Sequence, residues 1–245
     1  AEVRRLYPDT VFLSEAFTRP SMLTLLGKAG FSQSYTYFTW KTAKWELVEF
    51  VEQLRSWSTT VRPNLWPATP DILHASLQEG GRPAFESRLV LAATLSPSYG
   101  IYSGYERCEN VPVRPGSEEY LDSEKYEVKE RSLDGVLLPL VKRLNDIRGD
   151  HPALTHAGLE RLTWLETESE HLLGYARDLD GDVVLCVCNL DAYAVHDGVC
   201  VVPPSLGLPD GFEVVDRLTG ESYEWGGRNY VQLGPGQSHV FELRT

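Results

Sequence analysis

The stretch QSYTYFTWKTAKWELVEFVEQLRSW, residues 33–57, joins a β-rich run to an amphipathic segment and decides the fold of the first part of the chain. Its opening residues, 33–39, are rich in Tyr, Thr and Phe, which favour strands. In the segment that follows, Trp45, Val51 and Leu54 recur at helical spacing, so we expect a helix that turns these side chains toward the core. A strand followed by such a helix is the repeating unit of a parallel α/β sheet.

The same strand and helix unit recurs on both sides of this stretch. The expected strands, each with the helices that follow it, are residues 10–17 with 22–28, 33–39 with 43–57, 64–68 with 71–78 and 84–95, and 98–103 with 136–148. Four such units make half of a closed (β/α)₈ barrel, which needs eight. Because the first expected strand starts shortly after Ala1, we expect the preceding strands to belong to sequence outside these residues.

A long polar excursion, residues 105–134, separates the fourth expected strand from its helix. Loops of this length are uncommon in compact domains unless they are functional. From about residue 161 the pattern changes to short alternating runs separated by turn signals such as Asp180-Gly181. We therefore predict an antiparallel β-sandwich of roughly seven strands, with domains at residues 1–158 (the C-terminal half of a catalytic barrel) and 159–245 (the sandwich).

Composition narrows the possible partners. With 23 basic against 35 acidic residues the net charge is −12, which disfavours nucleic acid and anionic membrane surfaces and favours a neutral or small ligand. No run is apolar and long enough to span a bilayer. Four irregularly spaced cysteines indicate a reducing, cytoplasmic location. Two of them, Cys186 and Cys188, would share one face of a strand as buried apolar side chains.

Two carboxylates follow strands that lie two apart in the expected barrel. Glu15 ends the run FLSE, and Asp71 lies in ATPDIL after the third strand. Taken alone, Glu15 would be an ordinary surface carboxylate, and Asp71 would be the N-cap of the helix that follows it. Strands of one barrel point their carboxyl ends at a shared cavity, so the pair predicts carboxylates that converge. Glycosidic chemistry requires such a pair.

Longer strings in the chain resemble a known family. FLSEAFTRP, QSYTYFTWKTAKWEL, TPDILHASLQ, SPSYGIYSGYERCEN and SEKYEVKERS are similar to the maltosyltransferases of the α-amylase superfamily, which extend α-1,4-glucan with α-maltose 1-phosphate. The likeness covers essentially the whole chain. Most of the superfamily has His before the third carboxylate, whereas this chain has Pro70-Asp71, as the maltosyltransferase branch does.

The resemblance implies a role for each matching residue. Glu15 would be the general acid/base, and Asp71 would stabilise the transition state by gripping sugar hydroxyls. Lys125 and Tyr126 in SEKYE would bind the non-reducing end of the maltosyl unit, although a Lys-Tyr pair in an acidic loop is most often a solvated surface feature. The family's nucleophilic Asp lies on the strand before the Glu15 strand, and Asp9 is too close to Glu15 to replace it. We therefore expect residues 1–245 alone to be catalytically inert.

The resemblance also implies the partners. They are α-maltose 1-phosphate, α-1,4-glucan, the N-terminal half of the same enzyme and a second copy in a homodimer, with no metal and no organic cofactor in the reaction. Two alternatives remain open. One is a related α-glucan hydrolase or trehalose-forming isomerase, and the other is a non-catalytic carbohydrate-binding fragment.

Overall fold

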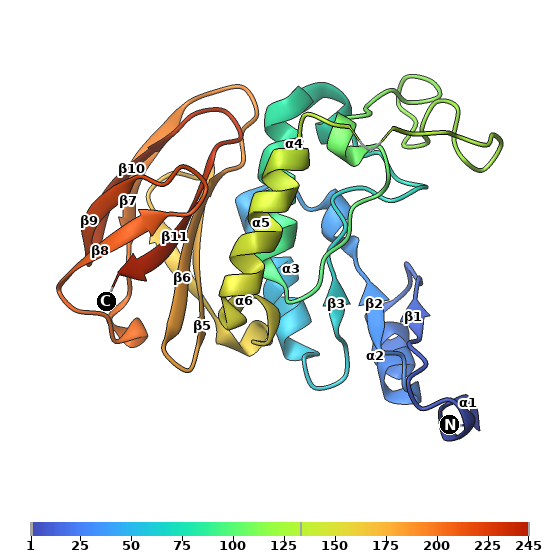
Figure 1. Cartoon of the computed structure of the whole chain (residues 1–245), viewed down its shortest axis with the longest axis horizontal. Helices are drawn as coiled ribbons and strands as arrows, with labels where there is room; N and C mark the ends of the chain where they lie inside the picture. Colours follow the sequence, from blue (N-terminus) through green and yellow to red (C-terminus); the bar gives the residue numbers. More distant parts are fainter. Residues whose placement is uncertain (1, 133, 245) are drawn as a thin grey trace.

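A small parallel sheet with its helices is followed by a larger antiparallel β domain, and both are parts of one packed structure (Figure 1). The computed structural model describes residues 2–132 and 134–244. In Figure 1 the antiparallel domain lies on the left, the parallel strands lie on the right, and long helices stand between them. This arrangement confirms the predicted fold class, a partial (β/α) barrel region followed by an antiparallel β domain.

The parallel sheet contains strands β1, β2 and β3 in that order, and it is flanked by helices. Its strands are β1 (Leu13–Ser14), β2 (Gln33–Tyr35) and β3 (Pro63–Asn64), all much shorter than the runs that predicted them. The fourth expected strand is reduced to a single parallel bridge between Leu65 and Tyr99. The chain leaves the sheet early because loops follow β1 and β3 at once, and the 3₁₀ helix Tyr37–Trp40 follows β2.

Six α-helices are described within residues 2–132 and 134–244. They are α1 (Glu2–Leu6), α2 (Pro20–Ala29), α3 (Lys44–Ser56), α4 (Ala75–Leu95), α5 (Leu138–Asp150) and α6 (Pro152–Thr155). The two helices expected at 71–78 and 84–95 correspond to the two helical segments of α4, which are separated at Gly81 by non-helical backbone with a φ of 55° and a ψ of −157°. Glycine adopts this left-handed conformation at little cost, and Pro83 two residues later cannot supply a backbone N–H to a regular helix.

The core-facing side of α3 differs from the prediction. Its buried residues are Leu47, Phe50, Val51 and Leu54, which recur three or four positions apart. Trp45 is 65% exposed, so the prediction that it faces the core was wrong. It lies in the first turn of the helix, on the face opposite the stripe that the four buried residues define.

The antiparallel domain contains eight strands, one more than predicted. Their order in the sheet is β10-β7-β4-β5-β6-β11-β8-β9. The strands are β4 (Leu162–Thr167), β5 (Leu172–Leu179), β6 (Asp182–Asn189), β7 (His196–Val201), β8 (Gly211–Asp216), β9 (Ser222–Gly226), β10 (Arg228–Leu233) and β11 (Ser238–Arg244). The prediction missed β10, although exposed and buried residues alternate along it. The predicted turn at Asp180-Gly181 is confirmed: both residues have positive φ and join β5 to β6 as a tight hairpin.

The sheet buries both of its faces. One face encloses a core within the β domain that includes Leu185, Trp225 and Phe241. The opposite face, which carries Tyr175, Cys186 and Cys188, belongs to the same hydrophobic core as α4. The prediction that the two cysteines share a buried face is therefore confirmed. Among the described residues, no helix combines the length and apolar character that a membrane span requires.

Polar bonds reinforce the packing of α4 against this face. Arg177 is fully buried, and its Nη1 donates to the carbonyl oxygen of Leu95 at 2.7 Å, where α4 ends. Its Nη2 donates to the carbonyl oxygen of Ala157. The hydroxyls of Thr94 and Tyr175 are 2.5 Å apart in the same layer. The end of α4 is thus fixed to β5 by a guanidinium that satisfies carbonyl groups which water cannot reach.

We expect Arg177→Met to lower the free energy of unfolding by about 2 kcal/mol, the typical contribution of hydrogen bonds to a charged group. The substitution keeps most of the side-chain volume and leaves two buried carbonyls without donors. The loss is limited because the Nε of Arg177 already lacks a partner. Urea unfolding followed by tryptophan fluorescence measures the change. Arg244→Met is the control, since its ion pair with Glu213 is exposed and we expect it to contribute less than about 1 kcal/mol.

Candidate active site

Glu15 and Asp71 lie at the same edge of the parallel sheet. Glu15 follows Ser14, the last residue of β1, and Asp71 lies in the loop after β3. The register pairs Ser14 with Ser34 and Tyr35 with Asn64, so the carboxyl ends of all three strands are level. Adjacent strands are about 4.8 Å apart, which puts the ends of β1 and β3 about 10 Å from each other. The two carboxylates are therefore on one rim, as barrel geometry requires.

A tight turn presents Asp71 to solvent. Thr69 and Ile72 exchange two backbone hydrogen bonds of 3.2 Å, and the backbone N–H of Asp71 donates to Oγ1 of Thr69 at 3.3 Å. Ile72 and Leu73 are buried immediately after it, so they anchor the turn in the core. The N-cap of α4 is His74, whose Nδ1 accepts from the N–H of Ser76. Asp71 is therefore free of the capping role that its sequence position suggested.

Lys125 reaches Asp71 from the long excursion. Its Nζ is 2.5 Å from Oδ1 of Asp71 and 3.6 Å from Oε1 of Glu119. The hydrogen bond to Asp71 is the main cause that raises the pKa of Lys125 above its ordinary value. Tyr126, the next residue, is 78% exposed. The structure thus brings Lys125 into contact with Asp71 and leaves the ring of Tyr126 at the surface beside them.

The excursion is held in place by hydrogen bonds to the start of α4. The N–H of Leu73 donates to the carbonyl oxygen of Glu118 at 2.7 Å. Nε2 of Gln78 donates to the carbonyl oxygens of Leu73 and Ser117 at 2.7 and 2.8 Å. The loop that carries Lys125 is consequently tied to the loop that carries Asp71, so their contact is built into the fold.

Aromatic side chains cluster where the three strands end. Burial, and next the charge of Glu15, raises the pKa of Tyr35. The ring of Tyr35 lies against Trp66, with centroids 5.2 Å apart. Nearby, Phe17, Tyr37 and Trp40 contact one another through ring centroids 5.3–5.7 Å apart. Such rings can stack on the apolar faces of sugars.

Glu118 and Glu119 are site residues that the sequence did not single out. Nε1 of Trp40 donates to both carboxylate oxygens of Glu118, at 3.0 and 3.1 Å, so this acid orients an aromatic ring. Glu119 is the second acid near Lys125. Their position in the acidic excursion was visible in the sequence, but an acidic run alone does not tell a site from a solvated loop.

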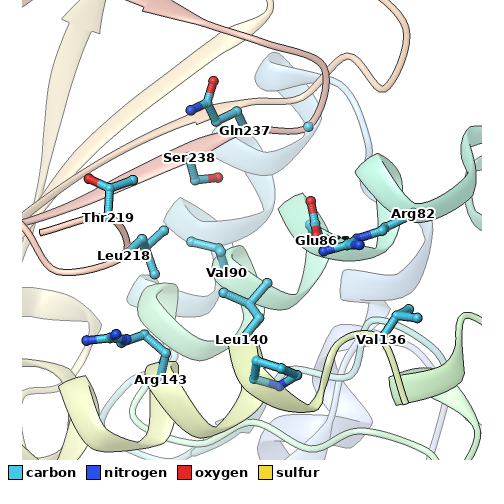
Figure 2. Close-up of a pocket in the computed structure, with 12 residues that line it drawn as sticks. Arg82, Glu86, Val90, Val136, Leu140, Arg143, Leu218, Thr219, Gln237 and Ser238 are labelled. Atoms are coloured by element: carbon cyan, nitrogen blue, oxygen red, sulfur yellow. Dashed lines mark hydrogen bonds and ion pairs between the residues drawn. The ribbon is translucent and has the colours of Figure 1, made fainter.

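A cavity lies elsewhere, between α4, α5 and the start of β11 (Figure 2). Its volume is about 400 Å³, and its apolar residues include Val90, Leu140 and Leu218. Its one carboxylate, Glu86, is paired with Arg82 at 2.7 Å. This cavity lacks the two acids that glycosidic chemistry requires, so the edge of the parallel sheet is the better candidate active site.

Comparisons with known proteins assign the family. A family profile described as "GLGE, C-terminal" matches residues 164–243. The chain is 51% identical, over its whole length, to α-1,4-glucan:maltose-1-phosphate maltosyltransferase 2 of Streptomyces coelicolor. This chain is a homologue of the GlgE maltosyltransferases. It is also 48% identical, over 99% of its length, to the maltosyltransferase of Mycolicibacterium smegmatis. The predicted resemblance is confirmed.

The chain spans little more than a third of these maltosyltransferases, 38% of the Streptomyces coelicolor protein and 36% of the Mycolicibacterium smegmatis protein. Solved α-amylases share its fold. An Anoxybacillus α-amylase superposes with a TM-score of 0.78 at 15% identity, covering 99% of this chain and 54% of that one. The Geobacillus thermoleovorans α-amylase gives 0.72 at 16% identity, covering 100% and 55%. These likenesses show that the chain shares its fold with the corresponding parts of α-amylases. The roles of Glu15, Asp71, Lys125 and Tyr126 stay predictions.

We expect Asp71→Asn to lower the pKa of Lys125 toward its ordinary value, because the substitution removes the anion that favours the charged ammonium. The titration of the Lys125 side chain, followed by NMR of its ¹³Cε resonance, measures the shift. Glu119→Gln is the matched control, and it should produce a smaller shift since its carboxylate is 3.6 Å away. An unchanged Lys125 titration in Asp71→Asn would mean that the two side chains do not pair in solution.

Proposed function

We propose that this chain contributes the acid/base and the stabilising carboxylate of a retaining maltosyltransferase, with α-maltose 1-phosphate as donor and the non-reducing end of α-1,4-glucan as acceptor. The observation that carries the proposal is identity near 50% with maltosyltransferases along the whole chain. The shared edge of Glu15 and Asp71 supports it, because the chemistry needs acids that converge.

In the first step a nucleophilic carboxylate attacks the anomeric carbon, and the bond from that carbon to the phosphate oxygen breaks. Glu15 assists by donating a proton to the departing phosphate. In the second step a hydroxyl of the acceptor glucan attacks the glycosyl-enzyme, and Glu15, now ionised, takes the proton from that hydroxyl. Two inversions give net retention, and the carboxylate nucleophile is regenerated. We place this nucleophile outside residues 1–245, on the strand that the family has before β1.

Asp71 has the charge and position to hold sugar hydroxyls and favour ring distortion toward the oxocarbenium-like transition state. Its carboxylate oxygens can accept hydrogen bonds from hydroxyls, and one of them is paired with Lys125. Lys125 and the exposed Tyr126 would hold the non-reducing end of the maltosyl unit from the same loop. The reaction as written requires neither a metal nor an organic cofactor.

We also propose a cytoplasmic location and a homodimeric complete enzyme. The location is supported by four cysteines that are all free. Homodimerisation rests on the family resemblance alone.

We expect residues 1–245 alone to release no phosphate from α-maltose 1-phosphate. The comparison is a chimera in which these residues replace the matching part of the Streptomyces coelicolor maltosyltransferase. We expect this chimera to release phosphate and to extend glucan. Within the chimera, Glu15→Gln should reduce kcat by about 10²–10⁴, the usual contribution of a general acid/base. Phosphate release and elongation of a maltooligosaccharide are the two measurements.

Asp9→Asn in the same chimera is the control, and it should leave kcat within about twofold because general acid/base catalysis depends on a positioned group that contacts the reacting atoms. Maltosyl transfer by the 245-residue chain alone would contradict the placement of the nucleophile. Hydrolysis of the donor without glucan extension would favour the hydrolase alternative, and maltose binding without turnover in the chimera would favour the non-catalytic one.

A further inference from the structure

Three side chains that commonly bind metals meet at one end of the antiparallel domain. They are His171, Asp191 and His196, and one potential ligand atom from each lies within 4.8 Å of the others. The rings of His171 and His196 are stacked with centroids 4.0 Å apart. His171 precedes β5, Asp191 lies in the loop after β6, and His196 begins β7. Two separate chain segments thus supply the cluster.

Backbone hydrogen bonds hold these segments together. The N–H of Leu190 donates to the carbonyl oxygen of His171 at 2.9 Å, which joins the two segments. The N–H of Gly236 donates to the carbonyl oxygen of Asp191 at 2.8 Å, which fixes the backbone at the acid. The positions of the three side chains therefore do not depend on contacts between the side chains themselves.

A buried asparagine rigidifies the loop that carries Asp191. Nδ2 of Asn189 donates to the carbonyl oxygens of Ala194 and Gly234 at 2.9 and 2.8 Å. Oδ1 of Asn189 accepts from the N–H of Asp191 at 3.0 Å. Asn189 is fully buried, so these bonds are shielded from water. The loop is consequently pre-organised in the way that supporting residues orient metal ligands.

The two oxygens of Asp191 have different partners. Oδ1 accepts from the N–H of Tyr193 at 2.8 Å, which fixes the orientation of the carboxylate. Oδ2 lies 2.8 Å from Nε2 of His196. Oδ1 therefore fixes the orientation of the carboxylate, and Oδ2 pairs with the imidazole of His196.

We propose that His171, Asp191 and His196 bind a divalent transition-metal ion with the preferences of Zn²⁺. Two imidazoles and one carboxylate are a ligand set that zinc uses when water occupies the fourth position. Bonds of about 2.0–2.1 Å in a tetrahedron separate the ligand atoms by about 3.3 Å. The ion would replace the hydrogen that lies between Oδ2 of Asp191 and Nε2 of His196. The imidazole of His196 would then carry its one remaining ring proton on Nδ1. His171 is exposed, so its ring can turn to complete the set.

The site would cross-link the start of β5 to the loop between β6 and β7. Its ligands are distinct from Glu15, Asp71 and Lys125, so the ion would stabilise the β domain rather than take part in maltosyl transfer. This assignment does not depend on the proposed function, and either can fail without the other.

The test uses the complete 245-residue chain after treatment with a chelator. We expect calorimetric titration with Zn²⁺ to give one ion per chain and Zn²⁺ to raise the Tm. Each of His171→Ala, Asp191→Asn and His196→Ala should weaken the affinity by more than about tenfold, since losing even an outer partner of a ligand costs about 10–100-fold. His156→Ala and Asp197→Asn are controls of the same residue types outside the cluster, and they should leave the affinity unchanged.

His171→Ala decides the outcome, because the side chain is exposed and its removal should leave the fold intact. If that variant binds Zn²⁺ as tightly as the unmodified chain, the proposal is overturned and the cluster is an ion pair with a stacked histidine only. Substitution with Co²⁺ gives an independent readout. A tetrahedral visible spectrum without a thiolate charge-transfer band supports the assignment, whereas a thiolate band places the ion on one of the four cysteines and overturns it.

Discussion

The burial of the second half of α4 on all sides is the constraint on which the rest of the structure depends. Every residue from 87 to 95 is buried, which is more than two full turns of helix with no face left to water. One side of the helix packs toward the parallel sheet and the other toward the face of the β domain that carries Tyr175. Arg88 shows the same constraint, because its buried guanidinium lies over the ring of Phe38 and donates to the carbonyl oxygens of Phe38 and Lys41. Neither part of the chain can bury this helix alone.

Much of the fold follows from the sequence because apolar periodicity reports burial directly. The runs of β5 and β6 and the turn between them were predictable, since Asp180-Gly181 adopts the positive φ values that a tight hairpin needs. The lengths of β1 and β3 were not predictable, because loop contacts end these strands and leave no local signal in the chain. The break between the two helical segments of α4 was predictable, because Gly81 takes a positive φ and Pro83 cannot continue the backbone hydrogen bonds of the first segment.

The candidate site was predictable to a smaller degree. Glu15 and Asp71 followed from their positions after strands, whereas the ion pair of Asp71 with Lys125 joins residues that no spacing rule connects. Glu118 is informative only through its bond to the indole of Trp40, which depends on how the excursion folds back. The cluster of His171, Asp191 and His196 was missed for a similar reason. Its members come from two segments, and they approach one another only after β5, β6 and β7 are arranged in the sheet.

The position of Asp71 links the two parts of the molecule. Its turn leads into α4 through Ile72 and Leu73, both buried, so any movement of α4 would carry the carboxylate with it. The far end of α4 is bonded to Arg177 of β5. The β domain, which contains the segment matched by the family profile, therefore acts as the support that fixes the helix and, through it, the acid at the sheet edge. In the proposed reaction a misplacement of Asp71 by about 1 Å would lower the rate, so the β domain would influence catalysis without contacting the substrate.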